Sequence, residues 1–482
     1  MKKLLQNRHT PFWLITFSVI TVLTLSVLIQ DGMFMDAMLY TSVAHNLSHG
    51  IGTFWFPEFS YHNIAGLPSF HEQPPLVFGI QALFFKLLGD SMYVERFYTF
   101  LTLIITALLI VILWKNIFPD NEKYRQTAWL PLFLWMIIPV GFWSYQHNMH
   151  ENTMTVFILL SVLFAYKAFK HEKHSVLLMI LSGIMIFAAT LSKGFPGFFP
   201  IVAPFLYWLT TRKISLKKAL LFSVVITATP LVIYGILFLF PESNKSLTLY
   251  LVKRVFHRIN LQPTVDNRFW ILWRLFTELL PSILFVLLFM LIAKIKKITF
   301  KLPGLFNEGL FFILLGLAGS APLMLTLVQK GFYFVPSLPF FGIGLAVLIV
   351  PVISSLIANI NVHSKAFRLL TAFSVVLFIS SIGYVIAQKD KTSRDKILLH
   401  DVYLIGKEVP AHSLVSIPFE MWEDEWSLQC YLMRYYYISL DPEYSELQHY
   451  FIINNALPLT VPEGYKKLNI NTIQYDLYVR KE

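Results

Sequence analysis

The most regular feature of the chain is an alternation between long apolar runs and short polar loops. A helix rises 1.5 Å per residue, so about 20 apolar residues cross a hydrocarbon core about 30 Å thick. About eleven runs reach this length, and we expect them to be membrane-spanning helices. They lie near residues 11–29, 94–114, 127–145, 152–169, 175–191, 196–210, 219–240, 275–293, 307–327, 333–352 and 369–387.

One further apolar run, residues 74–89, is shorter, begins with Pro74-Pro75 and contains Lys86. These features favour a helix that lies at the membrane interface or re-enters it, rather than a span. A twelfth span here would also place the later basic loops on the outer side, against the rule that Lys and Arg collect in cytoplasmic loops. The sequence therefore predicts about eleven spans, counted without this run.

The distribution of Lys and Arg gives the orientation. With the basic N-terminus in the cytoplasm, one set of loops carries the Lys and Arg clusters on the same side, as the positive-inside rule requires. That set comprises residues 115–126, 167–174, 211–218, 294–301 and 353–368. The other side, which we expect to be periplasmic, then receives a long first loop, residues 30–93, and everything after residue 388.

The final part of the chain differs in character, because charge rises and the apolar runs shorten. Residues 413–417, 450–454 and 473–479 have the composition of strands, and residues 393–408 and 425–437 could form helices. We therefore expect two domains: a transmembrane domain over residues 1–388, with interfacial helices in its 30–93 loop, and a small soluble α/β domain over residues 389–482.

Composition narrows the function classes. With 56% hydrophobic and 14% charged residues, the chain is too apolar for an ordinary soluble domain. The net charge of +11 is accounted for by the basic loops, so we expect no nucleic-acid partner. Cys430 is the single cysteine, which excludes an intrachain disulfide framework and a zinc site of several cysteines. Residues 1–29 lack a clear cleavage site, and we interpret them as a retained first helix.

Polar residues gather at the outer ends of the predicted spans, and each also has a purely structural interpretation. Asp36 begins a helical segment and could serve only its first turn. Lys193 lies between apolar helices, where a lysine can extend its charge to the interface. Lys330 and Tyr333 could belong to an aromatic belt. Glu72 follows a histidine in a loop, and such a pair needs further ligands before it can bind a metal.

Five segments of this outer face stand in a recognisable order. They are Asp36-Ala37-Met38-Leu39-Tyr40, Glu72-Gln73-Pro74-Pro75-Leu76, Glu151, Ser192-Lys193-Gly194-Phe195-Pro196-Gly197 and Lys330-Gly331-Phe332-Tyr333-Phe334-Val335-Pro336. In this order they resemble the motifs of the bacterial polyprenyl-phosphate-sugar glycosyltransferases of the GT-C class, which include protein O-mannosyltransferases and the lipid A aminoarabinose transferase. The resemblance covers residues 1 to about 350. Ala37, Gln73 and Glu151 stand where this family usually has an acidic residue, a lysine and an aspartate.

The resemblance implies a GT-C-like fold and an inverting transfer of a sugar from a polyprenyl-phosphate donor to a protein, a lipid A or a cell-surface glycan. It implies a general base, for which Asp36 is our candidate, and a supporting acidic residue, Glu151. It also implies cations and donors for the phosphate of the donor lipid, with candidates Lys193, Lys330, Tyr333, Arg254 and Arg258.

A divalent metal ion is compatible with the resemblance, with Glu72 and His257 as its candidate ligands. The expected location is the bacterial inner membrane. Neither the sugar nor the acceptor can be identified from the sequence.

Two other function classes stay open at this point. A transporter or lipid flippase could share the hydropathy, but transporters tend to place ionisable residues at mid-membrane in broken, repeated helices, and here they cluster at outer helix ends. A structural or assembly subunit, with its soluble tail binding a partner, is the third interpretation. Loss of activity on substitution of Asp36 would separate the enzyme from both.

Overall fold

The structure, a computed structural model, describes residues 7–60, 69–252, 263–298, 303–443 and 448–481 of the 482-residue chain. Its contacts divide the chain into two compact units. Unit 1 comprises Met1–Val27, Phe100–Gln146 and Glu151–Lys389. Unit 2 comprises Leu28–Thr99, His147–His150 and Asp390–Glu482. The division into domains made from the sequence stays a prediction.

Unit 1 is helical throughout its described residues. Its elements, some of which begin or end in unit 2, are α2 (Thr10–Ile20), η1 (Thr21–Leu25), α3 (Ser26–Leu28), α6 (Tyr93–Ile117), α7 (Glu122–Arg125), α8 (Trp129–Met136), α9 (Pro139–Ser144), α10 (His150–Lys170), α11 (Ser175–Lys193), η3 (Phe195–Val202), α12 (Ala203–Thr211), α13 (Leu216–Leu237), α14 (Pro241–Leu249), α16 (Trp270–Ile295), α17 (Pro303–Ser320), η5 (Ala321–Leu325), η6 (Gly331–Ser337), α18 (Leu338–Ala358) and α19 (Lys365–Ile386).

Within the described residues, nine helices are long and apolar enough to cross a membrane: Thr10–Leu28, Tyr93–Ile117, His150–Lys170, Ser175–Lys193, Leu216–Leu237, Trp270–Ile295, Gly304–Leu325, Gly331–Ala358 and Lys365–Ile386. Nine of the predicted spans correspond to them. The other two, near 127–145 and 196–210, are each built from two shorter helices, α8 with α9 and η3 with α12. Pro139 begins α9 and separates it from α8, because a proline removes a backbone donor. Helix η3 instead continues directly into α12 as one apolar helix, Phe195–Thr211, which is shorter than a full span and has Pro200 in its 3-10 part.

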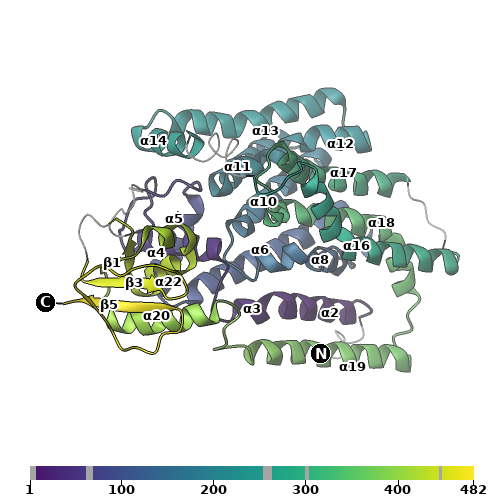
Figure 1. Ribbon diagram of the computed structural model, residues 1–482. Helices are drawn as coiled ribbons and strands as arrows, with labels where there is room; N and C mark the ends of the chain where they lie inside the picture. Colours follow the sequence, from purple (N-terminus) through teal and green to yellow (C-terminus); the bar gives the residue numbers. More distant parts are fainter. Residues whose placement is uncertain (1–6, 61–68, 253–262, 299–302, 444–447, 482) are drawn as a thin grey trace. The chain divides into compact units, whose positions relative to one another are not determined.

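Helices α17 and α18 approach each other closely at two glycines. A Cβ added to Gly344 would lie 2.9 Å from the carbonyl oxygen of Gly309, and one added to Gly309 would lie 3.1 Å from that of Gly344. Small residues at such crossings let helix backbones pack in a membrane, where no hydrophobic driving force joins helices. The same unit pairs α2 with α19, which run side by side (Figure 1).

The basic loops predicted to share one side of the membrane lie at one end of unit 1. Lys170, at the end of α10, donates to the carbonyl oxygens of Asn116 at 2.8 Å and Ile117 at 3.0 Å. Lys213, just after α12, pairs with the buried Glu308 near the start of α17. The alternation of helix ends therefore agrees with the charge pattern in the sequence, while the side of the membrane stays a prediction.

Unit 2 contains a five-stranded mixed sheet in the order β2-β1-β3-β5-β4. Strand β1 is parallel to β2 and β3, whereas β5 is antiparallel to β3 and β4. Figure 1 shows this sheet beside helices α20 and α22. The elements are β1 (Leu414–Ser416), β2 (Ser439–Asp441), β3 (Tyr450–Asn454), β4 (Tyr465–Lys467), β5 (Tyr475–Arg480), α4 (Met35–Ser48), α5 (Leu76–Leu88), α20 (Lys396–Glu408), α21 (Phe419–Asp424) and α22 (Trp426–Tyr436). The predicted helical membrane fold with a small C-terminal α/β domain is confirmed.

The C-terminal segment and the first loop are parts of one unit. Helix α22 packs along α4, and Ser42 of α4 donates to the carbonyl oxygen of Cys430 at 3.0 Å. Asp31 accepts from the hydroxyl of Tyr435 at 2.9 Å and also from that of Tyr403. The aromatic stretch around α22 therefore packs on the first loop, and its hydroxyls bind that loop's carboxylate.

Candidate functional site

Unit 1 holds a buried ion pair between two of the predicted site residues. The Lys193 ammonium lies 3.2 Å from Glu151 Oε1, and the two side chains are 7% and 2% exposed. Glu151 is in the first turn of α10, and Lys193 is in the last turn of α11. A helix N-terminus favours a negative charge and a C-terminus favours a positive one, so both helices stabilise the charge that they carry.

The residues after Lys193 bring the chain close to its neighbours, which explains the glycines of this motif. Gly194 has φ of +84°, and a Cβ there would collide with the hydroxyl of Tyr250. A Cβ at Gly197 would lie 2.7 Å from the backbone nitrogen of Thr190. Both positions exclude larger residues, so the motif turns tightly and fixes the end of α11 on which Lys193 stands.

The Lys330 motif forms a turn ahead of α18. Its preceding residue, Gln329, is buried and donates to the carbonyl oxygens of Arg268 at 2.8 Å and Thr326 at 2.9 Å. Lys330 itself is exposed, and its carbonyl oxygen accepts from the backbone nitrogen of Tyr333 at 3.1 Å. The turn therefore anchors its backbone in the protein and leaves the ammonium in contact with solvent.

A second cation stands beside this turn and was missed from the sequence. A Cβ added to Gly331 would lie 3.5 Å from Arg274 Nε, and Arg274 pairs at 2.6 Å with the buried Glu278. Glu278 also accepts from the backbone nitrogen of Val140 at 2.7 Å. The available signal was a pair of opposite charges four residues apart in an apolar helix, because charges in such helices are costly unless paired.

Asp36 lies in the first turn of α4, in unit 2, and is half-buried. Among the described residues, its carboxylate forms neither a hydrogen bond nor an ion pair. Burial raises the pKa of the nearby Cys430 thiol, and the negative charge of Asp36 adds to this shift. The first turn of a helix is also the end at which the helix dipole favours a negative charge.

The start of α4 is fixed by a neutral histidine. The backbone nitrogen of Phe34, which precedes α4, donates to His147 Nδ1 at 3.3 Å. Burial, together with the nearby positive charges of Arg394 and Arg96, lowers the pKa of His147 to about 3. His147 therefore stays an acceptor at neutral pH and holds the turn on which Asp36 stands.

The first two motifs meet each other within unit 2. Gln73, which stands where the family usually has a lysine, donates to the hydroxyl of Tyr40 at 3.1 Å. The ring of Tyr40 packs at 4.4 Å from that of His150. Asn148 joins the same region through hydrogen bonds to Thr41 at 2.9 Å and Gln81 at 2.8 Å. These contacts depend on the fold, so the sequence alone offered no sign of them.

The remaining predicted site residues are less informative. Arg254, His257 and Arg258 lie outside the described residues. Glu72 is half-buried, and in the described part of the chain it belongs to no group of three metal-ligating side chains. The described residues therefore do not supply a complete metal site around Glu72. The group that does qualify consists of His45, His49 and Asp90.

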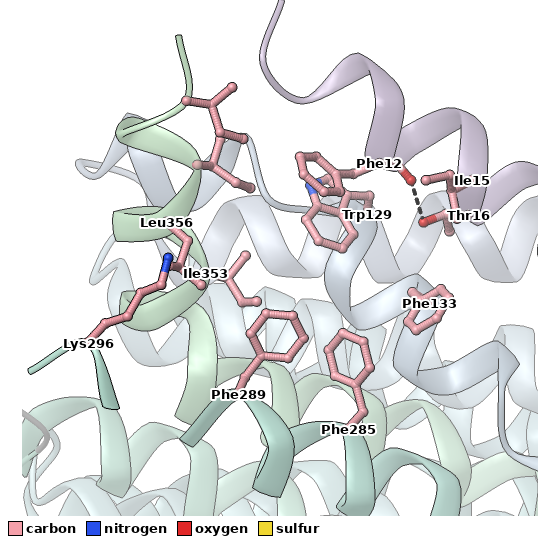
Figure 2. Close-up of a pocket in the computed structure, with 12 residues that line it drawn as sticks. Phe12, Ile15, Thr16, Trp129, Phe133, Phe285, Phe289, Lys296, Ile353 and Leu356 are labelled. Atoms are coloured by element: carbon pink, nitrogen blue, oxygen red, sulfur yellow. Dashed lines mark hydrogen bonds between the residues drawn. The ribbon is translucent and has the colours of Figure 1, made fainter. Parts of the chain in front are cut away.

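Unit 1 also contains an apolar hollow of about 420 Å³ (Figure 2). It is lined by aromatic side chains such as Phe12, Trp129 and Phe285, with Lys296 at its edge. Leu356, another lining residue, is 18 positions after Leu338, the first residue of α18, or about 27 Å along the helix. The hollow is therefore at the end of unit 1 opposite the Lys330 turn.

Comparisons with known proteins give a match to a family model over part of the chain, and a fold. The family model for dolichyl-phosphate-mannose-protein mannosyltransferases matches residues 72–236. Over 97% of both chains, the structure is similar to that of ArnT from Cupriavidus metallidurans bound to undecaprenyl phosphate, with a TM-score of 0.62 and 13% sequence identity. The apo structure of that protein matches over the same 97% of each chain, with a TM-score of 0.62 and 14% identity.

The oligosaccharyltransferase AglB of Archaeoglobus fulgidus is a more distant match, with a TM-score of 0.47 and 15% identity over 92% of this chain and 70% of that one. No curated protein sequence matches the chain. The GT-C resemblance drawn from the five motifs is confirmed.

Proposed function

We propose that this chain, a multi-span membrane protein with the fold of the GT-C glycosyltransferases, transfers a sugar from a polyprenyl-phosphate donor to an acceptor at the outer face of a bacterial inner membrane. The observation that carries the proposal is the buried pair of Glu151 and Lys193 in the motif positions of a transferase. The lipid named for the ArnT structure, undecaprenyl phosphate, suggests the class of donor.

Asp36 is the proposed general base. The acceptor hydroxyl or amine loses its proton to Asp36 as it attacks the anomeric carbon from the side opposite the phosphate. The bond between that carbon and the phosphate oxygen breaks, and polyprenyl phosphate leaves with the electron pair. One displacement inverts the anomeric centre, and a positioned base contributes about 10²- to 10⁴-fold to the rate of such a step.

Lys193 is proposed to stabilise the charge on the departing phosphate. An ammonium that is 7% exposed acts in a low dielectric, where its attraction for an anion exceeds that of a surface lysine. Glu151 holds this ammonium in place, which makes Glu151 a positioning residue rather than the base. Lys330 and Tyr333 are proposed to bind the phosphate as well, and Arg274, beside Gly331, adds a further cation. Arg254 and Arg258 keep the same proposed role.

The polyprenyl tail needs an apolar surface. An open apolar hollow of about 530 Å³ is formed by α12, α17 and η5, and it is lined by residues such as Phe205, Leu314 and Leu325. Helix α12 follows η3, which itself follows Lys193 and Gly194 in the chain. A prenyl chain in this hollow would run along the helices that extend from the proposed phosphate site.

The test is release of polyprenyl phosphate from a panel of polyprenyl-phosphate sugars by the purified chain in lipid nanodiscs, with membrane extract as acceptor. We expect wild type to release the lipid from one donor and Asp36→Asn to lose about 10²- to 10⁴-fold in rate. The asparagine keeps the size of the side chain and removes only its basicity. Asp120→Asn, an exposed aspartate in the predicted cytoplasmic loop after α6, serves as the matched control.

Equal release by wild type and Asp36→Asn would exclude Asp36 as the base but would leave the proposed transferase activity supported. If no donor yields polyprenyl phosphate, the transferase itself is excluded, and lipid or solute transport becomes the function to test. Glu72→Gln and chelator treatment, measured in the same assay, test whether Glu72 and a divalent ion take part.

A further inference from the structure

Two histidines and an aspartate of unit 2 converge on one point. His45 and His49 lie one helical turn apart at the end of α4, and Asp90 lies in the loop between α5 and α6. Asp90 Oδ1 is 3.2 Å from His45 Nε2 and 3.3 Å from His49 Nε2. The three ligand atoms all lie within 4.8 Å of one another. Residues at positions i and i+4 share a helix face, so the spacing presents both imidazoles to the same partner.

These separations match those around a tetrahedral metal ion. With metal–nitrogen and metal–oxygen bonds of about 2.0–2.1 Å and tetrahedral angles, neighbouring ligand atoms are about 3.3 Å apart. Both nitrogen-to-oxygen distances in the cluster lie at this value. An ion can therefore be placed between the three side chains with only small movements of their ends.

The hydrogen bonds of His49 show which of its nitrogens is available. His49 Nδ1 lies 3.0 Å from the carbonyl oxygen of His45, which can only accept, so Nδ1 carries the hydrogen. Its other nitrogen, Nε2, faces Asp90 Oδ1 at 3.3 Å. A ring nitrogen and a carboxylate oxygen at this distance share a proton or a metal cation between them. A carbonyl that orients the second nitrogen of a histidine is the usual support of a metal ligand.

Groups around the cluster hold it in shape. The Tyr437 hydroxyl lies 3.2 Å from His45 Nε2 and 3.0 Å from His49 Nε2. The backbone of Tyr437 has φ of +56°, a conformation that is strained for residues other than glycine. Arg434 donates to the carbonyl oxygens of Asp90 at 3.0 Å and Ser91 at 3.2 Å, which fixes the loop. Asp90 is 56% exposed, whereas His45 is buried, so an ion can enter from solvent and meet a preformed ligand.

We propose that His45, His49 and Asp90 bind a divalent transition-metal ion of the Zn²⁺ class, with water or Tyr437 at the fourth position. Two imidazoles and one carboxylate suit this class better than Mg²⁺ or Ca²⁺, which take oxygen ligands. The ion joins the end of α4, whose first turn carries Asp36, to the loop before α6. Its three ligands do not include the earlier candidates Glu72 and His257, and the site does not depend on the proposed sugar transfer.

The test is calorimetric titration of Zn²⁺ into the full-length protein in lipid nanodiscs, after removal of metals with a chelator. We expect wild type to bind one Zn²⁺ per cluster and His49→Ala to bind it at least about 100-fold more weakly, since even the loss of an outer-shell partner costs 10- to 100-fold. Asp90→Asn should weaken it as well. Both residues are partly exposed, so neither change leaves a buried cavity.

Three comparisons make the result decisive. His363→Ala removes an exposed histidine from the loop before α19 and should keep wild-type binding. Without metal, wild type and His49→Ala should unfold at the same temperature, and Zn²⁺ should raise the unfolding temperature of wild type alone. Equal Zn²⁺ affinity in wild type and His49→Ala, or no binding by wild type, would overturn the site. Loss of binding in Glu72→Gln but not in His49→Ala would assign the ion to Glu72 instead.

Discussion

At the scale of single residues, the pair of Glu151 and Lys193 raises the question of what a buried ion pair contributes. Removing two charges from water costs several kcal/mol per ion, and their attraction offsets this only when the geometry is good. Such a pair is therefore weak evidence for stability. Its retention in an apolar surrounding, at helix ends that favour each charge, is better explained by the need for an ammonium at that place.

A double-mutant cycle separates these contributions. We expect Glu151→Gln and Lys193→Met each to lower the free energy of unfolding by about 3–5 kcal/mol, because each leaves the partner's charge buried without its counter-ion. The free energy of unfolding of the double variant should fall by much less than the sum of the two single losses. Chemical or thermal unfolding in detergent gives the stability of all four proteins, namely wild type, the two single variants and the double variant.

The activity of the same variants tests the functional interpretation. Lys193→Met should abolish release of polyprenyl phosphate even in the double variant whose stability is restored. A double variant that regains both stability and activity would show that the pair is only structural, and additive losses of stability would show that the two charges do not interact.

At the scale of elements, the turn after α11 combines two different demands on Gly194. Its φ of +84° is a conformation that an L-residue with a side chain rarely adopts, and a Cβ there would also collide with Tyr250. Gly89 offers a matched comparison, because it has the same φ of +84° and nothing within 4 Å of an added Cβ. The two positions therefore separate backbone strain from steric exclusion.

We expect Gly89→Ala to lower the free energy of unfolding by about 1 kcal/mol, the cost of placing a side chain on a backbone with positive φ. Gly194→Ala should lower the free energy of unfolding by more than Gly89→Ala does. It should also reduce transferase activity, because the turn that fixes Lys193 must shift. Adding Tyr250→Phe should recover part of the loss by removing the hydroxyl. Equal effects of the two alanines on the unfolding temperature would mean that strain alone accounts for Gly194.

The elements that the sequence predicted best are those with the strongest local signal. Apolar runs of spanning length became helices, strands β1 and β3 lie within predicted segments, and β5 extends one residue past the third. The break between α8 and α9 was missed because mean hydropathy does not register the backbone donor that Pro139 lacks. The run near 196–210 is a helix, Phe195–Thr211, but it begins with 3-10 turns that contain Pro200. Strands β2 and β4 were missed because they contain Asp441 and two lysines, residue types that are depleted in strands.

The site was predicted only in part for a related reason. Motif order gave Asp36, Glu151 and Lys193, but no local signal could give the pairing of Lys193 with Glu151 across 42 positions or the approach of Arg274 to Gly331. The bonds of Gln73 to Tyr40 and of Asn148 to Thr41 likewise join residues far apart in the chain. Such contacts follow from packing, which a single sequence does not state.

At the scale of the whole molecule, the first loop and the C-terminal segment share unit 2 although about 300 residues separate them in the sequence. Their association rests on polar groups that are buried together. Arg434 of α22 is 2% exposed and pairs at 2.9 Å with Glu95, whose side chain is fully buried, while Arg96 lies 3.4 Å from the same carboxylate. Cooperative unfolding of the two segments is the consequence.

Replacing Arg434 with leucine tests this cooperativity. The change removes the bonds to the carbonyl oxygens of Asp90 and Ser91 and leaves Glu95 with Arg96 alone, so we expect a loss of about 3 kcal/mol, the lower end for a broken buried pair. Limited proteolysis followed by mass spectrometry should then show new cleavage in residues 28–99 and 390–481 at the same protease concentration. Glu122→Gln, which alters an exposed pair in α7, should leave the pattern of cleavage unchanged. Cleavage confined to the C-terminal segment, with the first loop still protected, would mean that the first loop stays folded without the C-terminal segment.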